Sequence, residues 1–434
     1  KLMSEDGKVH KIALLGLGTV GMGVYKLVEE RQKDEFYYKT GTRVEIKKIL
    51  VRNLAKKRPQ LAPKVILTDQ WSDILNDEEI DIIVEVMGGI EPARSYILEA
   101  LNAKKNVVTA NKDLLAEHGK ELFDTAKANK RDLLFEASVA GAIPIIRPLK
   151  QCLAGNNIDE IMGIVNGTTN YILTKMTSEG MDFAEALAKA TELGYAEADP
   201  TADIEGYDAA RKVAILASIA FHSRVVLDNV YVEGITAISA HDIRYATEAG
   251  YTMKLIGVAK NTKDGIEARV HPMLIPSSHP LAAVNDSFNA IFVHADAAGE
   301  VMFYGRGAGE LPTASAVVGD IIDVTRNIEF SSLGRISCSC YKNLPIKNIE
   351  QIESMYFLRI ECQDEPGVLA RIAKVFGDNQ VSISQFIQKD AIDGVAELVI
   401  ITHKVFECDI RKSVAELGDL DIVHKVSSII RVYG

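Results

Sequence analysis

The hydrophobic pattern of the N-terminal third of the chain predicts a parallel sheet with helices on both faces. Short apolar runs, which suit buried parallel strands, alternate with longer segments of helical spacing. The runs that we expect to form strands are residues 11–15, 44–51, 80–86 and 106–109. This alternation is typical of a doubly wound α/β domain, which binds its ligands at the carboxyl ends of the strands.

The first expected strand leads directly into a glycine-rich turn with the sequence GLGTVG. Glycines at this spacing permit a tight turn, close approach of the backbone to a pyrophosphate, and close packing of a helix on a strand. An amphipathic segment follows, as a dinucleotide-binding turn requires. The residues that we expect to contact the dinucleotide are Gly16, Gly18, Thr19, Val20 and Gly21. The alternative is a strand-to-helix turn that binds no nucleotide.

The second expected strand ends in a basic segment that contains no acidic residue. Arg52 comes first, and Lys56, Lys57 and Arg58 follow it. An acid at this place would bind the ribose 2′-hydroxyl of NAD, whereas cations suit the 2′-phosphate of NADP. We therefore expect NADP to be favoured and leave the use of NAD open. An ordinary solvated loop is the alternative.

The next two expected strands end at Met87-Gly88 and at Thr109, and Lys112 stands just beyond the second of them. Since strand ends meet at the ligand-binding edge of such a sheet, we expect these four residues near the nicotinamide end of the cofactor. For Lys112 the alternative is a surface lysine at a strand end, which is the commoner place for a lysine.

The segment 190–212 combines several carboxylates with a turn that leads into a new helix. Pro200 ends the preceding helical pattern, because proline lacks an N–H donor and restricts the residue before it. Asp208 and Lys212 then stand four residues apart on one helical face, so the carboxylate can orient the ammonium. The apolar run 213–221 carries this pair toward a core, where charges need partners. A solvated ion pair, contributing about 0.3–0.5 kcal/mol, is the alternative.

The same segment resembles the signature of homoserine dehydrogenases. The positions that fit the family motif without a gap are Ala190, Gly194, Asp199, Pro200, Asp203, Gly206, Asp208 and Lys212. The resemblance implies that Lys212 is the proton donor and acceptor at the substrate oxygen and that Asp208 orients it. It also implies that Glu197 anchors the α-amino group of the substrate, and we expect Asp203 and Tyr195 at the same site.

Three further motifs resemble the same family. The sequence VVTANKDLL implies that Lys112 is a second catalytic lysine. The sequence NGTTN implies that Gly167 and Thr168 lie beside the substrate and the nicotinamide, although such residues also cap helices. A later glycine loop implies that the chain returns to the cofactor domain, with Gly309 at the cofactor.

The sequence EASVAGAIP, at residues 136–144, is rich in small residues, which favours ligand contacts through backbone carbonyls. In homoserine dehydrogenases a similar loop binds sodium or potassium through main-chain oxygens. By this resemblance the monovalent cation would be bound by Glu136, Val139, Gly141 and Ile143. A tight turn without a cation is the alternative. Scattered histidines and an incomplete set of cysteines predict no transition-metal site.

The pattern of residues 355–434 predicts a separate βαββαβ domain with a ferredoxin-like fold. Its first helix begins with DEPGVL, which resembles the start of ACT domains, modules that bind amino acids or pair with one another. A helix N-terminus at a Pro-Gly turn can take a carboxylate, and threonine is the effector that we expect. A module used only for dimerisation is the alternative. We expect a homo-oligomer, either a dimer or a tetramer.

The length of 434 residues predicts about three domains. Their expected bounds are 1–140 for a Rossmann dinucleotide-binding domain, 141–334 for an α+β substrate and dimerisation domain whose residues 305–334 return to the cofactor domain, 335–354 for a linker, and 355–434 for the ACT-like domain.

The net charge of −11 and the pI near 5.4 argue against nucleic acid or an anionic membrane as the main partner. No apolar run is long enough to cross a membrane, and the first residues do not resemble an export signal. Five scattered cysteines suggest reduced thiols rather than a disulfide framework. We therefore expect a cytoplasmic protein.

The family resemblance extends over nearly the whole chain and implies the monofunctional form of the enzyme. It implies reversible, NAD(P)-dependent interconversion of L-aspartate 4-semialdehyde and L-homoserine, in the aspartate-derived pathway to threonine, methionine and isoleucine. Two alternatives stay open at this point. One is another ACT-bearing hydroxyacid dehydrogenase, and the other is a non-catalytic sensor of nucleotides and amino acids.

Overall fold

The computed structural model describes residues 8–31, 35–388 and 394–434. The chain divides into two compact units. The first runs to Ile158 and also contains Ala214–Leu227 and Val293–Asn343; the second contains Asp159–Val213, Asp228–Phe292 and Leu344–Gly434. The domain bounds expected from the sequence stay a prediction, and residues 1–7 of the first expected domain lie outside the described residues.

The first unit is built on a six-stranded parallel sheet with the order β3-β2-β1-β4-β5-β6. This is the strand order of a doubly wound Rossmann fold, so the predicted fold class is confirmed for this part of the chain. The strands are β1 (Val9–Leu15), β2 (Arg43–Leu50), β3 (Ile66–Thr68), β4 (Ile80–Glu85), β5 (Asn106–Thr109) and β6 (Leu133–Leu134). The near-continuous burial of β4 and β5 explains why their sequences read as plain apolar runs.

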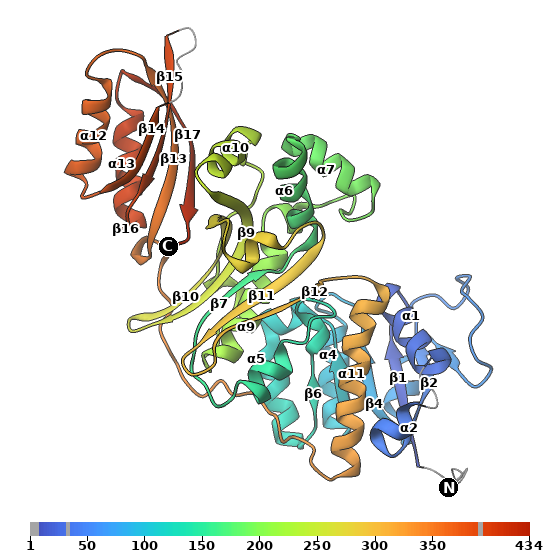
Figure 1. Cartoon of the computed structure of the whole chain (residues 1–434). Helices are drawn as coiled ribbons and strands as arrows, with labels where there is room; N and C mark the ends of the chain where they lie inside the picture. The colour runs from blue at the N-terminus through green and yellow to red at the C-terminus, as the bar shows by residue number, and fades with distance from the viewer. Residues whose placement is uncertain (1–7, 32–34, 389–393) are drawn as a thin grey trace. The chain divides into compact units, whose positions relative to one another are not determined.

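Helices of the first unit connect these strands and cover the sheet (Figure 1). They are α1 (Thr19–Tyr25), a π-helix (Lys26–Arg31), α2 (Glu35–Thr40), α3 (Trp71–Leu75), α4 (Ala93–Asn102), α5 (Lys112–Asn129), a 3-10 turn (Glu136–Ser138), a π-helix (Pro148–Cys152) and α11 (Glu310–Glu329). Strand β12 (Gly299–Arg306) immediately precedes α11.

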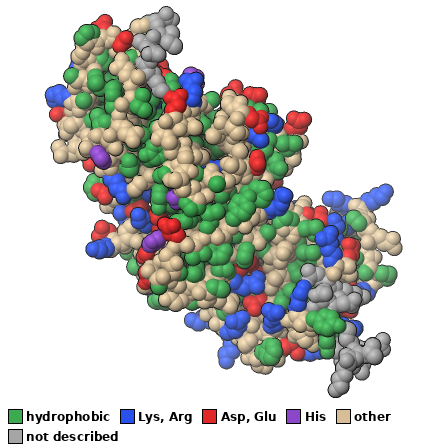
Figure 2. Space-filling view, in the orientation of Figure 1, with side chains coloured by type: hydrophobic (Ala, Val, Ile, Leu, Met, Phe, Trp, Pro, Cys, Tyr) green, Lys and Arg blue, Asp and Glu red, His purple; other side chains and the backbone are tan. Residues whose placement is uncertain are grey.

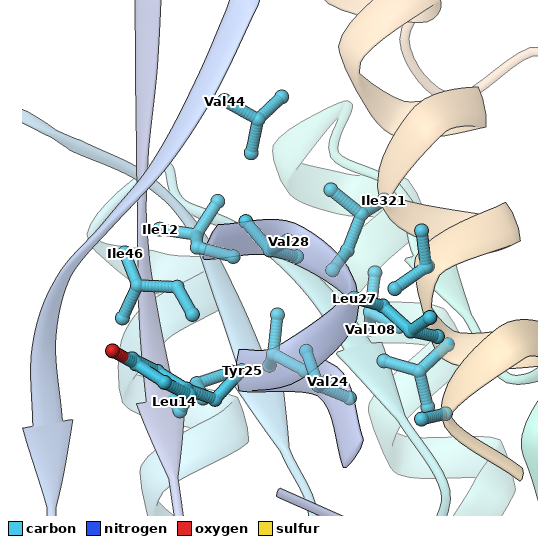
Figure 3. Packing of buried hydrophobic residues seen from close by; sticks show 14 of the residues in the cluster. Ile12, Leu14, Val24, Tyr25, Leu27, Val28, Val44, Ile46, Val108 and Ile321 are labelled. Carbon is cyan, nitrogen blue, oxygen red and sulfur yellow. The ribbon is translucent and has the colours of Figure 1, made fainter. Parts of the chain in front are cut away.

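One core joins the start of the first unit to α11, which comes almost 300 residues later in the sequence. Figure 3 shows Ile12 and Leu14 of β1 on one side and Val24, Val28 and Ile321 on the other. All five side chains are fully buried, and each contributes about 1.5–3 kcal/mol by leaving water. Helix α11 is therefore an integral part of the first unit.

The second unit contains the long antiparallel hairpin of β9 (Tyr251–Thr262) and β10 (Gly265–Pro276), with β7 (Ile158–Ile164) paired to β9. Its other elements are α6 (Gly167–Glu179), α7 (Phe183–Glu192), α8 (Thr201–Ile204), 3-10 turns (Pro280–Ala283 and Ile349–Gln351), β8 (Tyr231–Val232) and α10 (Ala240–Glu248). Three elements, α9 (Tyr207–Ala220), a 3-10 turn (Leu227–Asn229) and β11 (Phe288–Ala295), have residues in both units.

The C-terminal part of the second unit has the predicted βαββαβ order. Its elements are β13 (Glu353–Gln363), α12 (Val368–Asp378), β14 (Ile383–Gln388), β15 (Val395–Thr402), a short β16 (Val405–Phe406), α13 (Glu407–Gly418) and β17 (Val423–Val432). The sheet order is β17-β13-β15-β14, and both helices cover one face (Figure 1). The predicted ferredoxin-like fold is therefore confirmed. Strand β17 also pairs with β10 through Arg431 and Val432.

Acidic and basic side chains are interspersed on the face shown in Figure 2. In the part of the chain that the structure describes, no helix is both long enough and apolar enough to cross a membrane.

Candidate active site

Lys212 lies near the N-terminal end of α9 and is almost completely buried. Its ammonium donates hydrogen bonds to the Asp208 carboxylate and to the carbonyl oxygen of Val165, both at 2.6 Å. The predicted pairing of Asp208 with Lys212 is therefore present, and it is a buried pair rather than a solvated one. An ammonium has three N–H donors, so within the described residues these two acceptors leave one donor for a ligand.

Asn166 connects this pair to a second carboxylate. Its Nδ2 donates to Asp203 Oδ1 at 2.7 Å and to Asp208 Oδ2 at 2.8 Å. Its Oδ1 accepts from the N–H of Thr169 and so caps α6. The sequence suggested capping for this motif but not the bridge between two carboxylates. The only signal was an asparagine at the junction of an expected strand and helix.

Asp203 therefore faces another carboxylate in a partly buried place. Burial raises the pKa of Asp203 above its ordinary value of 3.8, and the charge of Asp208 raises it further. The hydrogen bond from Asn166 opposes this rise in pKa. Two nearby carboxylates repel each other, and the amide of Asn166 offsets part of this repulsion by donating a hydrogen bond to each of them.

Thr168 and Tyr195 lie next to this cluster. Thr168 donates its hydroxyl hydrogen to the carbonyl oxygen of Tyr195 at 2.7 Å, and the Tyr195 ring lies 4.8 Å from that of Tyr171. A side chain on Gly167 would come within 2.8 Å of the Ser287 carbonyl oxygen, so this position requires glycine. Four of the predicted substrate residues, Asp203, Gly167, Thr168 and Tyr195, are thus brought together.

Glu197, the predicted anchor of the substrate amino group, is exposed. Within the described residues its side chain makes no hydrogen bond or ion pair, so no contact ties it to Lys212. Its role stays a prediction.

The glycine-rich turn of the first unit has the geometry that the sequence predicted. Gly16 has a φ of 102°, which favours glycine, and a side chain on Gly21 would lie 2.3 Å from the Gly16 carbonyl oxygen. A side chain on Gly18 would meet nothing within 4 Å, so space is open there for a ligand. Thr19 and Val20 begin α1 directly after this turn.

A buried glutamate, Glu85, fixes the ends of β4 and β5, and the sequence pattern did not predict this role. One oxygen of Glu85 accepts from the N–H groups of Met87 and Gly88, and the other accepts from the Thr109 hydroxyl at 2.6 Å. Burial raises the pKa of this carboxyl, although these hydrogen bonds oppose the rise. Glu85 thus holds three of the predicted cofactor residues in place. The fourth, Lys112, is the first residue of α5.

In the basic segment after β2, Arg52, Lys56 and Lys57 are exposed and Arg58 is half-buried. Arg58 donates to backbone carbonyls within the loop, at 2.7 Å from Asn53 and 2.9 Å from Lys56, and thereby shapes it. Arg52 makes no such contact within the described residues and is exposed. Its guanidinium is therefore available to a ligand.

The loop expected to bind a cation is held together by hydrogen bonds to Glu136, one of its own residues. The Glu136 carboxylate accepts from the N–H groups of Ile145, Ile146 and Arg147 at 2.6–2.9 Å. Its side-chain oxygens are thus engaged with the protein. Gly141 has a φ of 55° and approaches residue 307 so closely that a side chain would lie 2.4 Å from the carbonyl oxygen there. The described residues contain no cluster of three or more His, Cys, Asp or Glu suited to a metal.

The late glycine loop ends at Gly309, which precedes α11 with a φ of 120°. A side chain on Gly23 would lie 2.5 Å from the Glu310 carbonyl oxygen, and Lys26 pairs with the Glu310 carboxylate at 2.6 Å. Gly309 therefore lies beside the helix that follows the dinucleotide-binding turn.

Models of protein families match three consecutive parts of the chain. Residues 16–136 match the NAD-binding domain of homoserine dehydrogenase, residues 144–322 match homoserine dehydrogenase, and residues 356–421 match the ACT domain. The homoserine dehydrogenase of Corynebacterium glutamicum is 49% identical over 432 residues, which are 98% of this chain and 96% of that protein. The chain belongs to the homoserine dehydrogenase family.

Solved structures agree with this assignment. A homoserine dehydrogenase from Thiobacillus denitrificans superposes with a TM-score of 0.93 at 41% identity, covering 98% of each chain. A hyperthermophilic archaeal homoserine dehydrogenase mutant in complex with NADPH superposes with a TM-score of 0.61 at 27% identity, covering 73% of this chain and 98% of that one.

The main prediction from the sequence is confirmed over both alternatives. The chain is a homoserine dehydrogenase family member, an NAD(P)-dependent oxidoreductase with a C-terminal ACT domain. Neither another hydroxyacid dehydrogenase nor a non-catalytic sensor accounts for these matches. The roles of individual residues are not tested by them and stay predictions.

Proposed function

We propose that Lys212 gives a proton to the substrate oxygen when L-aspartate 4-semialdehyde is reduced to L-homoserine, and takes it back in the reverse reaction. The observation that supports this proposal is the buried ammonium held at 2.6 Å by both the Asp208 carboxylate and the Val165 carbonyl oxygen. A donor fixed from two sides is suited to transfer its remaining proton in one direction. Asp208 acts as the positioning residue.

When bound, the nicotinamide supplies the hydride for this reduction. As the aldehyde carbon is reduced, negative charge grows on its oxygen. An ammonium within hydrogen-bond reach stabilises that charge and neutralises it by proton transfer. We propose that Lys112 assists Lys212 at the same oxygen.

The residues of the glycine-rich turn fit a dinucleotide, because Gly18 leaves open space and the turn leads into a helix N-terminus. We propose that this dinucleotide is preferentially NADP. The exposed Arg52, in a segment that lacks an acid, supports the proposal, as does NADPH in the archaeal relative. Met87, Gly88, Thr109 and Gly309 complete the proposed cofactor contacts.

For the substrate we propose contacts from Asp203, Gly167, Thr168 and Tyr195, which lie together around Asn166 or Thr168. Glu197 would bind the α-amino group from the exposed loop that precedes α8. A carboxylate partner suits that group, because it carries a positive charge at neutral pH.

We further propose a monovalent cation at the main-chain oxygens of Glu136, Val139, Gly141 and Ile143. The engagement of the Glu136 carboxylate with three N–H groups supports this choice of main-chain ligands. A threonine effector at the ACT domain, homo-oligomerisation, the domain bounds and a cytoplasmic location stay predictions from the sequence.

Lys212→Ala tests the central proposal. We expect NADPH oxidation with L-aspartate 4-semialdehyde to fall by about 10²–10⁴-fold, while the Kd for NADPH stays unchanged. Lys189→Ala is the matched control, because Lys189 belongs to the same unit but forms a surface ion pair with Glu179. A near-normal kcat for Lys212→Ala would remove Lys212 from the proton-transfer role.

A further inference from the structure

Two cysteines of the first unit, Cys338 and Cys340, lie together in the irregular segment after α11. Arg224 Nη2 lies 3.5 Å from Cys338 Sγ, and Cys340 Sγ lies 3.5 Å from the carbonyl oxygen of Ser218. Both cysteines line the same small cavity. Neither the fold nor the proposed reaction accounts for this arrangement.

Two cationic side chains, Arg224 and Lys150, line the same small cavity as the thiols. The cavity has a volume of about 30 Å³ and is lined by both cysteines, Lys150, Arg224 and Phe123 among others. The Nε of Arg224 is buried and has no hydrogen-bond partner in the described part of the chain. A water molecule needs about 10–15 Å³ of such space, so the cavity accommodates a hydrogen peroxide molecule, which has two oxygen atoms.

We propose that Cys338 and Cys340 form a peroxide-reactive thiol pair that closes a disulfide between them. The Cys338 thiolate attacks one oxygen of hydrogen peroxide, the O–O bond breaks, and Cys338 becomes a sulfenic acid while hydroxide leaves. The Cys340 sulfur then attacks the Cys338 sulfur, and the sulfenic oxygen leaves as water with the thiol proton. The two sulfurs lose two electrons in total, and the peroxide is reduced to water.

The order of attack follows from the neighbours of each sulfur. Hydrogen bonds from the thiol and the N–H of Cys340, together with the charges of Arg224 and Lys150, lower the pKa of Cys338 to about 5 against the effect of burial. The same hydrogen bond raises the pKa of Cys340, which keeps its proton. A thiolate beside an arginine is the reactive form of a cysteine, so Cys338 reacts first and Cys340 resolves the product.

The spacing permits the bond. Even in a fully extended strand, Cα atoms two residues apart are separated by only about 6.6 Å, so the irregular segment that holds both cysteines keeps them within the range that disulfides span. Both side chains line the same cavity, so the sulfurs lie on the same side of the segment. The other three cysteines have different environments, since Cys152 and Cys408 are exposed and Cys362 is buried in the C-terminal domain.

Peptide mapping of the full-length protein tests the proposal without any substitution. Trypsin cleaves after Arg335 and Lys342 and so releases both thiols in one peptide, ISCSCYK. After a limited dose of hydrogen peroxide, we expect this peptide to lose its two thiol hydrogens and to regain them with dithiothreitol. The peptides of Cys152 and Cys408 should keep their thiols at that dose. Oxidation of either exposed cysteine before this pair would overturn the proposal.

Two variants test the roles of the individual groups. In Cys340→Ser the resolving sulfur is lost, so dimedone should trap a sulfenic acid on Cys338; a lack of adduct there contradicts the proposal. Arg224→Gln should slow the reaction of Cys338 with peroxide about tenfold at neutral pH, because the thiolate loses its closest cation. An unchanged rate would contradict the proposed activation. Circular dichroism and the peptide map of Cys152 show whether each variant keeps its fold.

Discussion

The Lys212 cluster is built from side chains, whereas the glycine-rich turn of the cofactor-binding unit is built from the backbone. Around Lys212, side chains bond to side chains: Lys212 donates to Asp208, and Asn166 Nδ2 donates to both Asp203 and Asp208. At the turn, the decisive feature is the lack of side chains at Gly16, Gly18 and Gly21. The Lys212 site therefore depends on the polar side-chain atoms that it contains, and the turn depends on the absence of Cβ atoms at its glycines.

This difference predicts how each site fails. Removal of one polar group from a buried network leaves its partners unsatisfied and changes chemistry more than shape. Addition of one methyl group to a close backbone contact changes shape, and ligand binding fails with it.

The largest effect on cofactor binding that we expect is from Gly21→Ala. The added Cβ would lie 2.3 Å from the Gly16 carbonyl oxygen, so the turn must shift. We expect the affinity for NADPH to fall by at least about 100-fold and the free energy of unfolding to fall by about 2–3 kcal/mol. Isothermal titration and thermal unfolding measure the two effects.

Two other glycines serve as controls for that experiment. The methyl group added by Gly18→Ala would meet no protein atom within 4 Å, so we expect no loss of stability. It would occupy the space proposed for the dinucleotide, so NADPH binding should weaken. Gly155→Ala, which also meets nothing within 4 Å, should change neither quantity. Normal NADPH affinity in Gly21→Ala would show that the turn does not bind the dinucleotide.

The next largest effect concerns Asn166. Asn166→Ala removes the donor that Asp203 and Asp208 share, and we expect kcat to fall by about 10–100-fold with an unchanged Kd for NADPH. The loss of the helix cap should also cost about 1 kcal/mol of stability.

Asn166→Ser separates these two consequences. Serine retains a capping oxygen, but its hydroxyl cannot replace the two amide donors. Stability should therefore recover while kcat stays low. If both variants turn over normally, the bridge between the carboxylates has no part in the reaction.

Arg52→Ala tests whether a side chain contributes to cofactor binding at a site formed mainly by backbone atoms. Loss of a guanidinium that meets the 2′-phosphate should weaken NADPH binding by about tenfold and leave NADH binding unchanged. Arg31→Ala removes the same charge from another exposed position of the unit and should alter neither affinity. Equal loss for both nucleotides would refute the proposed contact.

The sequence predicted elements whose pattern is local. The run at 106–109 became β5 with the same bounds, because a buried parallel strand is apolar throughout. The i,i+4 pair of Asp208 and Lys212 was also visible, since one helical turn fixes their distance.

Contacts between residues distant in the sequence were not predictable in this way. Asn166 is 37 residues from Asp203, and Glu85 is 24 residues from Thr109. No periodicity reveals such pairs, because they exist only after the strands and helices have packed. The engagement of the Glu136 carboxylate with Ile145, nine residues away, was missed for the same reason.

The smallest effect that we expect is the stability cost of the side-chain cluster, which Asp203→Asn should relieve. The folded-state pKa of Asp203 is raised above 3.8 by burial and by Asp208, so the folded protein holds this proton more strongly than the unfolded chain. Stability therefore falls as pH rises from about 4 through the raised pKa. Asparagine has no proton to lose, and the variant should be more stable at pH 7 by less than about 1 kcal/mol.

The pH dependence of this gain shows whether ionisation of Asp203 causes it. Thermal unfolding between pH 4 and 8 should show the advantage of Asp203→Asn shrinking toward pH 4. Asp199→Asn is the control of opposite sign, because hydrogen bonds from Thr201 lower the pKa of Asp199. Its contribution to stability is present above about pH 4 and is lost only as the pH falls below that value, so that variant should be less stable than the parent protein throughout pH 4–8. A gain for Asp203→Asn that did not change with pH would mean that repulsion from Asp208 is not its cause.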